Sequence, residues 1–85
     1  MKFDARILLE ILQNIIKCRN SAYYDRLYEH FDHVVYLYEE KCFTGIAEKD
    51  LSGRVVRIKH LSLTKNGQEV LKKLLIGKRT KVNYK

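Results

Sequence analysis

The sequence of 85 residues contains no proline and only four glycines. This composition argues against a flexible linker or a low-complexity chain. Long apolar runs are missing as well, because runs such as residues 7–9 and 74–76 fall far short of the roughly 20 residues that a bilayer requires. Asp4, Arg6 and Glu10 interrupt any secretory apolar core near the start. We therefore expect a single soluble domain in the cytoplasm, without membrane contact.

Cysteine is scarce, and in a cytoplasmic protein we expect Cys18 and Cys42 to be reduced, partly buried thiols instead of a disulfide. His30 and His33 lie three residues apart without a CxxC or HxxxH pair beside them, which is poor spacing for a metal site. We therefore expect no bound metal.

The motifs of common enzymes are also missing. The sequence has no glycine-rich phosphate loop and no nucleophile elbow. His60 and Ser62 lie close together on one predicted strand, but no acidic partner for a hydrolytic triad is evident. We expect a protein that is not an enzyme, with no cofactor and no small-molecule substrate.

Acidic residues are almost absent from the second part of the chain. Residues 1–50 contain seven Lys or Arg and nine Asp or Glu, a net charge of −2, whereas residues 51–85 contain ten Lys or Arg and only Glu69, a net charge of +9. This asymmetry indicates that one part of the molecule meets a polyanion. A basic tail that only aids solubility is the alternative, but it leaves Arg54 and Arg57 unexplained.

Three helices are predicted before residue 42. An apolar stripe at helical spacing behind Asp4, a good capping residue, predicts the first helix over residues 5–17. Asp32 is expected to cap the third helix, over residues 33–41. The second is predicted from four residues at positions i, i+3, i+4 and i+7, namely Tyr24, Leu27, Tyr28 and Phe31.

The pattern then changes to that of strands, over residues 42–49 and 54–63. The residues between them have turn chemistry, and Gly53 can adopt a positive φ. These features predict a β-hairpin.

Thr64 is a good cap for a last helix, which Gly77 is placed to end. The remaining residues show no periodicity, and we expect them to be mobile. The predicted division is a domain over residues 1–76 and a basic tail over residues 77–85.

Two segments carry a resemblance to a known family. Residues 38–43 resemble the end of the third helix in winged-helix regulators, and residues 61–71, with Leu63-Thr64 followed by Gly67, are similar to the stretch that enters the helix after the wing. The sequence thus resembles small winged helix-turn-helix proteins of bacteria, archaea and their phages. The resemblance implies an α+β fold in which three helices are followed by a β-hairpin wing and a C-terminal helix. The two motifs are not specific to one activity, but this fold together with the positive charge after residue 50 leads to our main hypothesis. We expect the protein to bind double-stranded DNA, as a small transcriptional regulator or a mobile-element accessory protein.

The chain departs from that family in its third helix. Cys42 stands where a glycine often ends this helix in a left-handed conformation, so the corner must be built differently. As the recognition helix, it would offer His33 and Tyr36 to base edges, but Glu39 and Glu40 are also expected to be exposed. Two carboxylates beside phosphates disfavour ordinary insertion into the major groove.

The wing is therefore the favoured contact with nucleic acid. Lys49, Arg54, Arg57 and Lys59 lie on or beside the predicted hairpin and can reach phosphates or a narrow minor groove. Charges that protect an edge hairpin from aggregation are the alternative.

Further cations follow on the last helix and the tail. If that helix lies beside the hairpin, as the resembled fold implies, the two form one continuous positive surface; a solvated helix face is the alternative. The cations concerned are Lys72, Lys73, Lys78 and Arg79, followed by Lys81 and Lys85.

A protein-interaction or dimerisation module on the same scaffold is a second hypothesis, and RNA binding is a third. The second rests on an acidic, tyrosine-bearing face of helices two and three, formed by Tyr23, Glu29, Tyr36, Glu39 and Glu40. Tyr23, Tyr36 and Tyr84 lie off the apolar stripes, so they can be read either as base-stacking residues or as protein contacts.

Overall fold

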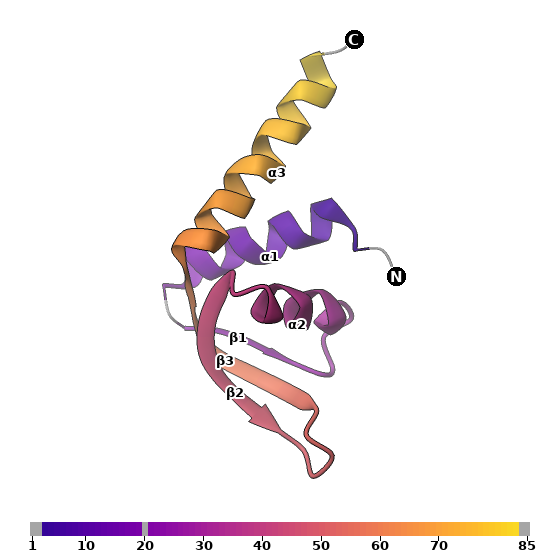
Figure 1. Cartoon of the computed structure of the whole chain (residues 1–85), viewed down its shortest axis with the longest axis vertical. Helices are drawn as coiled ribbons and strands as arrows, with labels where there is room; N and C mark the ends of the chain where they lie inside the picture. Colours follow the sequence, from indigo (N-terminus) through magenta and orange to yellow (C-terminus); the bar gives the residue numbers. More distant parts are fainter. Residues whose placement is uncertain (1–2, 20, 84–85) are drawn as a thin grey trace.

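The computed structural model describes residues 3–19 and 21–83, with side chains up to residue 77. Within this part of the chain, three helices accompany a three-stranded antiparallel sheet with strand order β1-β3-β2 (Figure 1). The predicted α+β class is confirmed. In chain order the elements are α1 (Ala5–Cys18), β1 (Ala22–Asp25), α2 (Phe31–Glu39), β2 (Phe43–Lys49), β3 (Val55–Leu63) and α3 (Lys65–Asn83).

Helix α1 forms as predicted. The carboxylate of Asp4 caps it by accepting a hydrogen bond of 2.9 Å from the backbone amide of Arg6. Ile11, Leu12 and Ile15 on its inner face are buried. The helix ends where Arg19 adopts a left-handed conformation with φ of 47°.

The predicted second helix is wrong. Residues 22–25 form strand β1, with Tyr24 buried in the core and Leu27 86% exposed, whereas a helix would have put both on one apolar side. Asp25 explains the change, because its carboxylate accepts a hydrogen bond of 2.9 Å from the amide of Leu27 and so ends the strand in a turn. Turns fill residues 26–30 up to α2, so the described residues contain no helix-turn-helix pair.

Helix α2 corresponds to the predicted third helix but starts two residues earlier. The corner after it is built at Lys41, which takes the left-handed conformation with φ of 61°, and not at Cys42. The amide of Cys42 donates to the carbonyl of Leu37 at 2.9 Å and closes the corner. Cys42 itself is buried, and burial raises the pKa of its thiol. Both cysteines are free thiols, as predicted.

The β-hairpin is confirmed at both of its strands, and Gly53 in its turn has φ of +88°. Strand β3 departs from simple alternation at His60, where φ is +57° and the register shifts. This bulge lets Ile58 and Leu61, three residues apart, both point into the core, where neither is exposed. It sits opposite Gly45, where a Cβ would lie only 3.0 Å from the carbonyl oxygen of Lys59.

Helix α3 starts at the predicted cap, since the hydroxyl of Thr64 accepts a hydrogen bond of 3.0 Å from the amide of Gly67. Gly67 fits closely against the α2–β2 corner, and a Cβ there would collide with the carbonyl of Cys42. The predicted end at Gly77 is wrong, because the helix continues to Asn83. Whether residues 77–85 form a mobile tail stays a prediction, and Tyr84 and Lys85 lie outside the described residues.

The helices and the sheet share one core. Helices α1 and α2 lie on the same side of the sheet, and side chains from α1, α2, β2 and β3 meet there. The molecule is elongated, 50 Å along its longest axis, because α3 leaves the body at an angle and carries the chain away from the hairpin (Figure 1). The hairpin tip and the end of α3 therefore lie at opposite ends of the molecule.

Candidate nucleic-acid interface

The turn of the hairpin is organised by Asp50. Its Oδ1 atom accepts hydrogen bonds from the amide of Ser52 at 2.9 Å, the hydroxyl of Ser52 at 2.6 Å and the amide of Arg54 at 3.1 Å. These donors stabilise the ionised carboxylate and lower its pKa, with the Ser52 hydroxyl as the largest cause. The turn fixes the backbone on which Lys49 and Arg54 are exposed.

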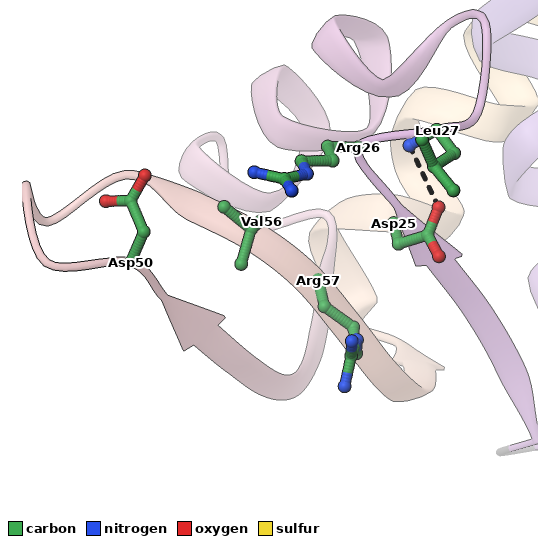
Figure 2. Close-up of a pocket in the computed structure, with 6 residues that line it drawn as sticks. All are labelled: Asp25, Arg26, Leu27, Asp50, Val56 and Arg57. Atoms are coloured by element: carbon green, nitrogen blue, oxygen red, sulfur yellow. Dashed lines mark hydrogen bonds between the residues drawn. The ribbon is translucent and has the colours of Figure 1, made fainter.

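A third cation reaches this region from another segment. The amide of Arg26, in the turn after β1, donates to the carbonyl of Val56 at 2.9 Å and ties that turn to the hairpin. Between them lies an open hollow of about 270 Å³, with the side chain of Arg26 directed toward the hairpin (Figure 2). The hollow is lined by Asp25, Arg26, Leu27, Asp50, Val56 and Arg57.

Arg26, Lys49 and Arg54 form what we call the hairpin-end cluster. All three are exposed, and none has an ion pair or a side-chain hydrogen bond within residues 3–19 and 21–77. The neighbouring carboxylates of Asp25 and Asp50 accept hydrogen bonds from other groups. The cluster can therefore offer its cationic groups to an anion outside the molecule.

The other two cations of the predicted wing are arranged differently. Glu48 holds both, with Oε1 3.0 Å from the Arg57 guanidinium and Oε2 3.3 Å from the Lys59 ammonium. Arg57 also lies over the ring of Tyr23, at 5.9 Å from its centroid. Each of the three charged side chains is 38–45% exposed, so such pairs are weak and can open for a competing anion.

His33 was expected to be exposed to solvent, and this prediction is wrong because the side chain is buried. Its Nε2 accepts a hydrogen bond of 3.1 Å from the amide of Asp4, so Nδ1 carries the proton and donates to the Asp32 carboxylate at 2.8 Å. This bond from His33 is the largest cause of the lowered pKa of Asp32. Tyr36 is half-buried and stacks on Phe3 with ring centroids 4.2 Å apart.

The surface that α2 leaves exposed is acidic. Asp32, Glu39 and Glu40 are exposed, as predicted for Glu39 and Glu40. The two residues expected to contact bases, His33 and Tyr36, instead contact Phe3 and Asp4 just before α1. A negative helix surface repels a phosphate backbone. Groove insertion of α2 therefore has no support in the geometry.

The cations of α3 do not join the hairpin. Lys72 and Lys73 are exposed on a helix that leads away from the hairpin tip (Figure 1). A continuous positive surface required the helix to lie beside the hairpin, and that condition is not met. The side chains of Lys78 and Arg79 lie outside the described part of the structure.

The acidic face expected for a protein partner is also divided. Tyr23 lies on the sheet beside Arg57, whereas Tyr36 is covered by Phe3. Glu39 and Glu40 are exposed at the end of α2, whereas Tyr36 on the same helix is only partly exposed.

Sequence reasoning missed Arg26 because it placed residues 24–31 on a helix. The signal was present in Asp25, whose carboxylate favours a turn directly before Arg26. Among the described residues, no group of three His, Cys, Asp or Glu is placed to hold a metal ion, and no helix is long and apolar enough to cross a membrane.

Comparison with known proteins finds no match to a family model, to a curated protein or to a solved structure. The fold and the hairpin-end cluster are therefore the basis for a functional assignment.

Proposed function

We propose that this protein binds double-stranded DNA through its hairpin, on a scaffold that resembles a winged helix. The observation that carries the proposal is the hairpin-end cluster, in which Arg26, Lys49 and Arg54 from two segments are exposed at one end of the molecule without intramolecular partners in the described chain. Phosphate oxygens are the natural partners of such groups.

The scaffold is compatible with this assignment. An antiparallel sheet of order β1-β3-β2 that extends into a hairpin, with α1 and α2 on one side of it, is broadly compatible with a small winged-helix-like fold. The element order differs from the predicted one, because strand β1 and the turns at residues 26–30 stand in place of the second helix. Because the exposed surface of α2 is acidic, binding is expected to depend on phosphate contacts instead of base readout. Sequence-neutral binding of this kind fits a mobile-element accessory protein better than a regulator of one operator.

The test compares two double variants that each remove two cations. Arg26→Ala with Arg54→Ala removes charge at the hairpin end, whereas Lys72→Ala with Lys73→Ala removes the same charge from exposed positions on α3. Fluorescence anisotropy with duplex DNA is measured across a series of salt concentrations. The hairpin variant should bind more weakly, and the slope of log K against log salt should be shallower by about 2.

The α3 variant should keep a slope close to that of the unmodified protein. Equal losses in the two variants would show that net charge alone drives binding, and an absence of binding at low salt would reject the proposal outright. Tighter binding of duplex RNA than of duplex DNA would replace DNA by RNA as the ligand.

A further inference from the structure

The face of the sheet opposite α1 and α2 carries an ordered set of side chains. In the register, Tyr23 of β1 and Ile46 of β2 both lie opposite Lys59 of β3, so the three form one row across the sheet. Opposed residues in antiparallel strands place their side chains on the same face. Tyr23 is 49% exposed and Ile46 is 54% exposed, although both are large and apolar.

A second row runs beside the first. Asp25 and Glu48 both lie opposite Arg57, on the same face as the first row. The Tyr23 hydroxyl donates to the Asp25 carboxylate at 3.0 Å, which fixes the direction of the ring. The two oxygens of Glu48 hold Arg57 and Lys59 on β3, so both cations lie on the strand next to the exposed Tyr23, and Arg57 lies over its ring.

We propose that this outer sheet face binds unpaired bases of DNA, with Tyr23 stacking on a base while Arg57 and Lys59 contact the adjoining phosphates. The inference rests on the proposed function, because Arg57 also lines the hollow beside the hairpin-end cluster (Figure 2). A duplex held by the cluster can thus pass a single-stranded extension directly onto the sheet.

The chemistry of the face favours unpaired bases over a duplex. Bases in a duplex are stacked on one another, and their flat surfaces cannot reach a tyrosine ring on an open sheet. Unpaired bases expose those surfaces, and an aromatic ring accepts any of them without regard to sequence. Arg57 and Lys59 can then neutralise the phosphates of the backbone. Their ion pairs with Glu48 are partly exposed and weak, so a phosphate can take the place of the carboxylate.

The experiment uses a blunt DNA duplex and the same duplex with a short single-stranded thymidine extension. The unmodified protein should bind the extended duplex about fivefold to tenfold more tightly than the blunt one, the low end of the effect of stacking one base. Tyr23→Ala should remove this preference and leave the affinity for the blunt duplex unchanged. Tyr23→Phe keeps the ring and should keep the preference.

A spectroscopic readout separates stacking from a general effect on folding. The protein contains no tryptophan, so Tyr23→Trp introduces a single reporter, whose fluorescence the extended duplex should quench more strongly than the blunt one. Thermal unfolding of the alanine and phenylalanine variants verifies that both fold.

Three outcomes overturn the inference. One is a preference for the extension that survives Tyr23→Ala, and another is the absence of any preference in the unmodified protein. The third is self-association, by sedimentation equilibrium, that Tyr23→Ala and Ile46→Ser abolish, because a second copy would then cover this face. If one of these three outcomes is found and the variant of Arg26 and Arg54 still weakens binding of both duplexes, this inference fails while the proposed function stands.

Discussion

The imidazole of His33 accepts a hydrogen bond from the backbone amide of Asp4, 29 residues earlier in the chain, at 3.1 Å. Asp4 is also the cap of α1, so one side chain of α2 fixes the point at which α1 begins. The ring of Phe3 covers the arrangement by packing edge-on against His33 and flat against Tyr36. Both residues expected to contact bases therefore join two helices instead.

His33→Ala should destabilise the protein by about 1–3 kcal/mol, because the Asp4 amide loses its partner and the Asp32 carboxylate loses a donor. Urea denaturation measures the change, and Gln13→Ala at an exposed position of α1 is the control. Affinity for duplex DNA, measured where the variant is folded, should be unchanged. A variant that is as stable as the unmodified protein but binds DNA more weakly would mean that His33 contacts the DNA.

Gly67→Ala should destabilise the protein by at least about 3 kcal/mol or prevent folding, since the new Cβ would meet the Cys42 carbonyl where the first turn of α3 packs against the α2–β2 corner. Gly77→Ala on the same helix is the matched control. A Cβ at Gly77 meets nothing within 4 Å, and alanine is the better helix former. Thermal unfolding followed by circular dichroism should show a lower unfolding temperature for Gly67→Ala. Gly77→Ala should show a helical signal equal to or higher than that of the unmodified protein. Two variants of equal stability would mean that α3 does not dock there.

Much of the fold could be predicted from local sequence signals. Asp4 and Thr64 cap helices with their own side chains, and residues 50–53 form a turn by themselves, so tertiary contacts were not needed to locate them. Segment 22–31 could not be predicted in this way. The position of Tyr24 is compatible with the apolar stripe of a helix and with the alternation of a strand. The segment becomes a strand because it pairs with β3, which is distant in the sequence.

The candidate site was predictable only in part. Lys49 and Arg54 follow from their place beside the turn, but the pairing of Arg57 with Glu48 depends on strand register. Arg26 joins the site through a backbone hydrogen bond to Val56, thirty positions away, which no local pattern indicates. His33 was assigned to the surface because helical periodicity does not include the start of α1 that covers it.

Acid should loosen the turn of the hairpin through Asp50. The pKa of this carboxyl group is lowered in the folded protein by the Ser52 hydroxyl and then by the Arg54 amide. A lowered pKa means that the stabilisation is present above the ordinary value of 3.8 and is lost as the pH falls through the lower folded value. An NMR titration of the Ser52 and Arg54 amides should show a midpoint below 3.8.

Asp50→Asn provides the comparison, because the amide retains an acceptor oxygen but cannot titrate. Its hairpin amides should show no acid transition in this range. A transition that persists in Asp50→Asn would have to come from another carboxyl group, and the role of Asp50 in the turn would be rejected.

Glu48→Gln should strengthen binding to DNA. The carboxylate of Glu48 holds Arg57 at 3.0 Å and Lys59 at 3.3 Å, so its neutralisation releases both cations and removes a negative charge from the same sheet face. Glu69→Gln makes the same change in net charge at an exposed position on α3, and the gain in affinity by anisotropy should be larger for Glu48→Gln. Stability should fall by less than about 1 kcal/mol, as expected for partly exposed ion pairs. Weaker binding by Glu48→Gln would instead mean that the carboxylate positions Arg57 and Lys59 for the ligand and that their release costs more than the added charge gains.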